Sequence, residues 1–351
     1  MKKLLVVILL GVLYLLLWPV PLEPVAWQPP PAPELVGPYA ENNALAKIER
    51  LADGVAEGPE DILFDQRGHM YAGFVDGTIR RFNVDGEEPV VIANTGGRPL
   101  GMAWADNRTI AVADGDKGLL AVSLEGDVKV LAEEADGLRF AFADDVAVAS
   151  DSTMYFTDAT YKFGGGEFMA DILEHGGNGR LLSYHPDTGV VTTLLDGLQF
   201  ANGVALGPNE EYLLVTESGA YRIVRYWLKG PKQGTHDIFM DNLPGLPDNI
   251  SFDGEETFWL ALFTSRNKML DAIAGQPWLR KVAYRLPTFV QPKAKQHAFV
   301  LGMNAEGEVV HNLQYAAKDA YAPITSVHKQ GEALYFGSLT ITAIGRMPAP
   351  K

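Results

Sequence analysis

The sequence predicts an all-β fold, a six-bladed β-propeller with a short helical insertion and an N-terminal membrane anchor. Beyond residue 44, short runs rich in Val, Ile, Leu, Tyr and Phe alternate with turns rich in Gly, Asp and Asn, which is typical of strands. A loose strand-turn-strand repeat also occurs six times, at roughly 40 to 60 residues with one longer gap, close to the period of a propeller blade. A third observation, an apolar run after two lysines, predicts the anchor.

The N-terminal segment, residues 1–20, has the pattern of a secretory targeting sequence. Lys2 and Lys3 precede an apolar run from Leu4 to Leu17. No cleavage pattern of small residues follows, so we expect an uncleaved signal anchor; cleavage and secretion is the alternative. The lysines favour a cytoplasmic N-terminus with the rest of the chain exported, into the periplasm if the source is bacterial.

Residues 21–43 are expected to form a proline-rich spacer. Eight prolines fall between Pro19 and Pro38. Proline fixes φ and removes a backbone donor, which disfavours both helix and sheet. We expect this spacer to hold the folded domain away from the membrane.

The predicted propeller occupies residues 44–351. Its six repeats begin near Gly58, Gly97, Phe142, Phe200, Leu246 and Ile324. The segment Ala44–Leu51 has no partner strand nearby in the sequence, so we expect it to add a strand to the sheet of the last repeat. That pairing closes the ring and removes exposed sheet edges.

A helical insertion is expected at about residues 265–290. Leu270, Ile273 and Ala274 share one helical face, and Pro277 is suited to the start of a second helix. Two interpretations remain open. The insertion is either a lid over one end of the channel or a surface element packed for stability.

The charge balance disfavours nucleic acid as a partner. Lys and Arg total 29 against 44 Asp and Glu, which gives a net charge of −15. Such a field repels phosphate backbones. The chain has no cysteine, which excludes disulfides, thiolate metal sites and a cysteine nucleophile.

Oxygen-bearing side chains recur at the starts of the repeats, where the innermost strands of a propeller converge on the channel. They are Glu60 with Asp61, Asp144 with Asp145, Asn202, and Asp248 with Asn249. Carboxylate and amide oxygens without His or Cys are the ligands that Ca²⁺ prefers. The alternative is that these residues only stabilise turns before strands.

Several blocks along the chain resemble the strictosidine synthase-like family, most closely its membrane-anchored branch. The blocks are GPEDILFD, NGRLLSYHPDTG, LLDGLQFANGVAL, VRYWLKGPKQGTHDIFMDNLPGLPDNISFD and SRNKMLDAIAGQPWLRKVAYRLP. The resemblance covers nearly all of the chain beyond the anchor. It implies a six-bladed propeller with an axial calcium ion, as in the related paraoxonases, diisopropylfluorophosphatase and the gluconolactonase/regucalcin group.

The resemblance also implies a set of calcium ligands. It places them at Glu60, Asp144, Asn202 and Asp248, with Asn249 as an additional ligand and Glu57 as an alternative to Glu60. Asp144 stands where the relatives have asparagine, which raises the charge of the site. Asp61 and Asp145 match positions that help to hold a second, structural calcium ion in paraoxonases.

The activity that the resemblance implies is calcium-dependent hydrolysis of a small apolar ester or lactone. The paraoxonase histidine near the second repeat is replaced by Arg98 and Leu100, so we expect Asp248 or His328 to act as the base. Tyr321 and Thr325 stand where strictosidine synthase has its glutamate, which disfavours that synthase reaction. The alternative is a non-catalytic propeller that binds a ligand or a protein around a structural calcium ion.

Overall fold

Six four-stranded antiparallel sheets make up most of the chain, each formed by strands that are neighbours in the sequence except at the point of closure. The first three are β2 (Ile62–Phe64), β3 (Met70–Gly73), β4 (Thr78–Phe82) and β5 (Val90–Asn94); β6 (Pro99–Trp104), β7 (Thr109–Asp114), β8 (Gly118–Ser123) and β9 (Val128–Ala132); and β12 (Ala143–Val148), β13 (Met154–Asp158), β14 (Gly179–His185) and β15 (Val190–Leu198). A small hairpin, β10 (Glu134–Ala135) and β11 (Leu138–Arg139), lies between the second and third sheets in the sequence.

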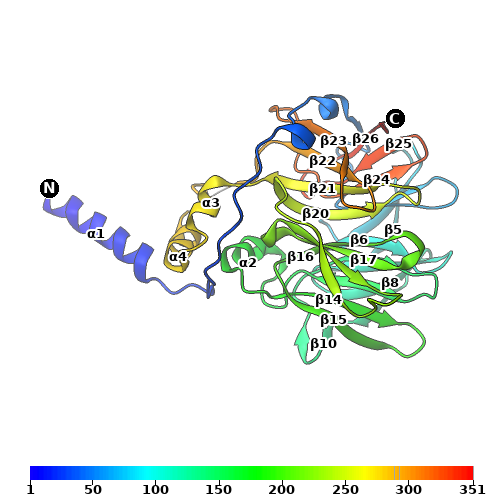
Figure 1. The fold of residues 1–351 in the computed structure, drawn as a ribbon, viewed down its shortest axis with the longest axis horizontal. Helices are drawn as coiled ribbons and strands as arrows, with labels where there is room; N and C mark the ends of the chain where they lie inside the picture. The colour runs from blue at the N-terminus through cyan, green and yellow to red at the C-terminus, as the bar shows by residue number, and fades with distance from the viewer. Residues whose placement is uncertain (288, 292, 351) are drawn as a thin grey trace.

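The remaining sheets complete the ring. They are β16 (Ala201–Leu206), β17 (Tyr212–Glu217), β18 (Arg222–Trp227) and β19 (His236–Met240); β20 (Gly245–Phe252), β21 (Phe258–Ser265), β22 (Ala298–Met303) and β23 (Val309–Tyr315); and β24 (Val327–Gln330), β25 (Ala333–Phe336), β26 (Ile344–Pro348) and β1 (Glu49–Leu51). The computed structural model describes residues 1–287, 289–291 and 293–350. The first strand of each sheet contacts that of the next, from β2 round to β24 and back to β2. This arrangement confirms the predicted six-bladed propeller (Figure 1).

The ring closes through the pairing that the sequence predicted. Strand β1 runs antiparallel to β26, with Glu49 opposite Arg346 and Leu51 opposite Ile344. Arg346 also forms an ion pair with Glu49. The N-terminal strand therefore completes the last blade, and no blade is left with three strands.

The core lies between adjacent blades, where side chains alternate along each strand. In β7, Ile110 and Val112 pack against residues of the first blade, whereas Ala111 and Ala113 pack against those of the third. This alternation is expected because successive side chains of a strand point to opposite faces of the sheet. Both faces of each blade are thus covered by neighbours, which fixes the strand starts around the channel.

The predicted helical insertion is present as two short helices, α3 (Lys268–Ile273) and α4 (Pro277–Arg285). The side chain of Asn267 caps α3 by accepting hydrogen bonds from Met269 and Leu270 backbone N–H groups, and Pro277 opens α4. Helix α4 packs against α2 (Phe168–Glu174). Short 3₁₀ turns occur at Gly37–Tyr39, Ala44–Lys47, Gly165–Glu167, Pro208–Glu210 and Ser218–Ala220.

The N-terminal helix α1 (Lys2–Leu17) extends away from the propeller (Figure 1). It has 16 residues, none of them buried. Among the described residues, no helix has both the length and the apolar character needed to cross a bilayer, so the structure does not support the spanning anchor expected for residues 1–20.

The proline-rich segment after α1 lies against the body of the protein, in contrast to the free spacer that the sequence suggested. Leu22 is fully buried, and the Trp27 ring stacks on His175 at a centroid distance of 4.0 Å. The backbone N–H of Val25 donates to the Glu174 carbonyl, and Arg280 donates to the carbonyl of Val25. These contacts hold the segment on α2 and α4 although it forms no regular secondary structure.

Candidate functional site

A β-bulge recurs at the start of the innermost strand in four blades. The strand register shifts between Pro99 and Met102, Ala143 and Val146, Ala201 and Val204, and Pro247 and Ile250. The residues inside these shifts include Asp144, Asp145, Asn202, Asp248 and Asn249. A bulge inserts an extra residue and redirects side chains, so these polar groups leave the sheet faces and turn toward the channel.

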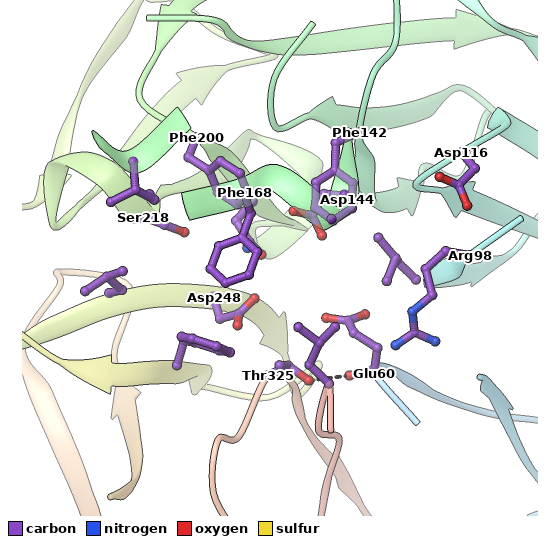
Figure 2. A pocket seen from close by; sticks show the side chains of 18 residues that line it. Glu60, Arg98, Asp116, Phe142, Asp144, Phe168, Phe200, Ser218, Asp248 and Thr325 are labelled. Carbon is purple, nitrogen blue, oxygen red and sulfur yellow. Dashed lines mark hydrogen bonds between the residues drawn. The ribbon is translucent and has the colours of Figure 1, made fainter. Parts of the chain in front are cut away.

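A cavity of about 260 Å³ opens above these strand starts. Figure 2 shows the carboxylates of Glu60, Asp144 and Asp248 pointing into the same part of this pocket. The rest of the wall is mainly apolar and comes from blades, from α2 and from the turn before it; its apolar members are Leu100, Phe142, Phe168, Ile172, Phe200, Leu246, Phe263 and Leu339. Helices α3 and α4 contribute no wall residue within the described chain, and α4 packs against α2, which does.

Hydroxyl side chains link the bulged backbone of their own blade to that of the next blade. Thr157 Oγ1 accepts a hydrogen bond from the Asp145 N–H and donates to the Asn202 carbonyl. Thr216 Oγ1 repeats this pattern with the Gly203 N–H and the Asp248 carbonyl. The sequence analysis missed these threonines, although their shared place at the end of the second strand in the FTD and VTE segments is a signal of the repeat.

Four buried oxygen atoms at the base of the pocket have no hydrogen-bond partner. They are Glu60 Oε2, Asp144 Oδ2, Asn202 Oδ1 and Asn249 Oδ1. An unsatisfied buried polar atom is uncommon and costs about 1–3 kcal/mol. Four such atoms lie together here, from residues that are 2–7% exposed, and a positively charged group would satisfy them.

The carboxylates of this cluster resist ionisation in the absence of such a group. Burial, followed by the Asp248 and Asp144 charges, raises the pKa of Glu60 well above its usual range. Burial and the neighbouring carboxylates also raise the pKa of Asp144 and Asp248, whereas Arg98 partly opposes the effect on Glu60 and Asp144. Asn249 Nδ2 donates to Glu60 Oε1 at 2.6 Å, which is a second partial compensation.

The oxygen atoms available to a metal ion at this site come from amides as well as from carboxylates. Within the ranges that the structure describes, no three side chains of His, Cys, Asp or Glu are arranged to hold a metal ion. Two of the four unpaired atoms are amide oxygens, which are not among those residue types. A hard cation would therefore depend on Asn202 and Asn249 as well as on the carboxylates.

The predicted ligand residues Glu60, Asp144, Asn202 and Asp248 all line the pocket, and Asn249 joins them through its hydrogen bond to Glu60. Glu57, the alternative to Glu60, is exposed, and its backbone carbonyl accepts the Val75 N–H. Of these two alternatives, only Glu60 lies in the described pocket wall.

Asp61 and Asp145, the residues expected at a second ion, do not line the pocket and are already hydrogen-bonded. His328 Nε2 lies 2.6 Å from Asp61 Oδ1, and Asp61 Oδ2 accepts the Met102 N–H. Asp145 accepts the backbone N–H groups of Val146 and Val204. Burial lowers the pKa of His328, but the Asp61 and Asp145 charges outweigh it and raise that pKa overall.

This pairing changes the interpretation of His328. The sequence suggested it as a base acting on substrate, yet its ring bonds Asp61 and is absent from the described pocket wall. Asp248, the other predicted base, is in the wall and is 5% exposed. Of the two residues expected to act as a base, Asp248 therefore lines this pocket and His328 does not.

The family is decided by comparison with known proteins. A strictosidine synthase profile matches residues 144–231, and a strictosidine synthase-like N-terminal profile matches residues 37–82. Strictosidine synthase-like protein 6 of Arabidopsis thaliana is 36% identical over 319 residues, covering 89% of this chain and 84% of the relative. The chain belongs to the strictosidine synthase-like family.

A second relative is similar over most of the chain. The human adipocyte plasma membrane-associated protein is 32% identical over 361 residues, covering 94% of this chain and 84% of the relative. The blocks quoted from the sequence therefore identified the family correctly.

Solved structures share the fold at low sequence identity. A gluconolactonase from Xanthomonas campestris superposes with a TM-score of 0.63 at 15% identity, over 87% of this chain and 89% of its own. A calcium-binding protein, regucalcin, from Agrobacterium tumefaciens gives 0.58 at 13% identity, over 85% and 90%. These likenesses support the propeller fold of this strictosidine synthase-like protein.

Proposed function

We propose that this protein is a calcium-dependent hydrolase of a small apolar ester or lactone. The observation that carries the proposal is the cluster of four unpaired, buried oxygens at the base of an apolar pocket. Propellers that resemble it in fold include a gluconolactonase. The name of that protein supports the hydrolysis of a cyclic ester as the reaction. The apolar pocket wall of this chain favours a substrate that is less polar than a sugar lactone.

The residues present fit a calcium ion in donor chemistry and charge. Glu60, Asp144 and Asp248 supply carboxylates, and Asn202 and Asn249 supply amide oxygens that are unpaired or can turn. Ca²⁺ takes six to eight oxygen ligands, including waters and amides. When bound, it would polarise a carbonyl oxygen and lower the pKa of a bound water.

The protein's own groups would position the substrate and move the proton. Phe142, Phe168 and Phe200 would pack against the apolar part of the ester and exclude water from it. Asp248 would accept the proton of the attacking water, since its carboxylate lies in the wall of the pocket. Thr157 and Thr216 would hold the backbone of Asn202 and Asp248 in place during the reaction.

The test is turnover of aryl esters and lactones by the full chain, with Ca²⁺ added and then removed by a chelator. We expect hydrolysis that is lost on chelation while the circular dichroism spectrum is unchanged. Asp248→Asn should abolish turnover but retain the shape of the site. Asp241→Asn, at an exposed position outside the pocket, is the matched control.

A second candidate is a non-catalytic propeller in which calcium is structural. It is favoured by one observation: no histidine is found in the described pocket wall, so the commonest general base is absent there. Under this alternative the chain shows no turnover of any ester. Calcium would still raise its melting temperature, and a ligand of the apolar pocket would raise it further.

We also propose that the protein associates with membranes through α1. The helix exposes a long series of apolar side chains, from Leu4 to Leu17. Arg285 holds its C-terminal end by donating to the carbonyls of Leu15 and Trp18, next to α4, where Trp278 is 58% exposed. The name of the human relative supports membrane association. Flotation of the full chain with lipid vesicles, lost on Leu9→Asp with Leu10→Asp, would test it.

A further inference from the structure

We infer that the His328 side chain takes the place of a second metal ion in the channel, so that Asp61 bonds the imidazole ring and no calcium ion is held at Asp61 and Asp145. This inference concerns a different level of the channel from the proposed hydrolytic site. It rests on that proposal only for the expectation that one other ion is bound. It reverses the second ion that the family resemblance implied for Asp61 and Asp145.

The three side chains come from three different blades. Asp61 precedes β2 of the first blade, Asp145 lies in the bulge of β12 in the third, and His328 lies in β24 of the last. The segment Gly101–Met102 connects them, because the Met102 N–H donates to Asp61 and a Cβ built on Gly101 would lie 2.1 Å from Asp145 Oδ1. Only glycine at position 101 allows the approach of Asp145.

All four carboxylate oxygens of this cluster are in use. Asp61 Oδ1 bonds His328 and Asp61 Oδ2 accepts the Met102 N–H at 3.1 Å. Asp145 Oδ1 accepts the Val146 N–H at 2.7 Å, and Asp145 Oδ2 accepts the Val204 N–H at 2.8 Å. The contrast with the pocket base is direct, since no oxygen of Asp61 or Asp145 is among the buried unpaired atoms.

Calcium would find poor ligands in this arrangement. It takes six to eight oxygens, and an ion bound at Asp61 Oδ1 would have to displace the His328 imidazole from that oxygen. The displaced imidazole would then lose its acceptor, at a cost of about 1–3 kcal/mol. The His328 side chain is 30% exposed, so access from solvent does not prevent an ion from reaching the cluster. The chemistry of the cluster decides its occupant.

The hydrogen bond between Asp61 and His328 has a structural consequence. Asp61 belongs to the first blade and His328 to the last, so their hydrogen bond crosses the junction where the ring closes. The His328 side chain is part of the chain and remains in place when calcium is removed. The propeller should therefore stay closed at this junction under chelation.

The experiment is a count of bound calcium on the full chain, by mass spectrometry of metal after equilibrium dialysis in micromolar Ca²⁺. Wild type, His328→Ala, Asp145→Asn and the exposed control His236→Ala are compared. We expect one ion in wild type, in Asp145→Asn and in His236→Ala. We expect one more ion in folded His328→Ala, because the vacated space between two carboxylates becomes available to calcium.

Two results would overturn the inference. One is two ions in wild type that fall to one in Asp145→Asn, which would place calcium at Asp145. The other is a folded His328→Ala protein whose ion count equals that of wild type. If His328→Ala does not fold, the comparison of wild type with Asp145→Asn decides alone. A count of zero in wild type would contradict the proposed hydrolytic site, whereas a gain of one ion in His328→Ala would still support this inference.

Discussion

The amide of Asn249 donates a 2.6 Å hydrogen bond to the carboxylate of Glu60, although 189 residues separate them in the chain. The bond crosses the channel from the fifth blade to the first. Within the described chain, Glu60 is the only carboxylate that the first blade contributes to the pocket wall. The hydrogen bond places it next to the Asn249 amide, whose oxygen has no hydrogen-bond partner. The closed ring thus turns residues from distant repeats into a single oxygen cluster.

Asp144→Asn should stabilise the metal-free protein and weaken its response to calcium. The substitution removes one of three buried carboxylates whose pKa values are raised by burial and then by the charges of their neighbours. We expect the free energy of unfolding in chelator to rise by about 1–3 kcal/mol. The rise in melting temperature with calcium should shrink. Differential scanning calorimetry with and without chelator measures both; a variant less stable than wild type in chelator would contradict the repulsion.

The same carboxylates predict a pH dependence in chelator. Their pKa values are raised in the folded state, which therefore keeps protons that the unfolded chain releases above about pH 4. Their contribution to stability is present at low pH and is lost as the pH rises through the folded pKa values. The melting temperature of wild type should decline relative to that of Asp144→Asn as pH rises. If the melting temperatures of both proteins change in parallel with pH, the pKa of Asp144 is not raised in the folded state.

Gly165→Val should reduce the binding of bulky esters. A Cβ built on Gly165 would lie 2.4 Å from Phe142 Cε2. A side chain at position 165 must therefore displace the Phe142 ring, which is part of the pocket wall. Gly166 offers a matched control, because a Cβ at that position meets nothing within 4 Å. We expect KM for a bulky ester to rise several-fold in Gly165→Val and to remain near the wild-type value in Gly166→Ala. Equal values of KM in both variants would contradict this account of the wall.

Acid should release the N-terminal segment that stacks on His175. Burial lowers the pKa of His175 to about 3, so the folded state keeps the ring neutral. This contribution to stability is complete above the unfolded pKa of about 6.5 and is lost as pH falls toward the folded value. The hydrogen-exchange protection factors of residues 20–28, which correct for the intrinsic effect of pH on exchange, should therefore fall below about pH 6. His175→Phe retains the stacking surface and should abolish this loss of protection; the same loss in that variant would exclude His175 as the cause.

The sequence allowed the ring and most of the oxygen cluster to be predicted because both follow from a repeat. Strand alternation and turn residues recur in each blade, and Glu60, Asp144, Asn202 and Asp248 occupy equivalent places in it. The closing strand was predictable because Ala44–Leu51 lacked a local partner.

The features that the sequence did not predict are contacts outside the repeat pattern. Asp61 and His328 are 267 residues apart, and no spacing rule joins them. The docking of the proline-rich segment depends on Trp27 meeting His175 and on Arg280 meeting a backbone carbonyl. Composition alone predicts that such a segment is a spacer. A high proline content limits the conformations of the backbone, but it does not show whether the segment packs against another surface of the protein.

We propose that calcium used in hydrolysis binds at one oxygen cluster, formed by Glu60, Asp144, Asn202, Asp248 and Asn249. The most direct measurement is aryl-ester turnover by the full chain, titrated with calcium after chelation, in parallel with calorimetric binding. We predict that turnover and binding saturate together and that Asn202→Leu abolishes both. Turnover that persists without calcium, or calcium binding that survives Asn202→Leu unchanged, would contradict the account.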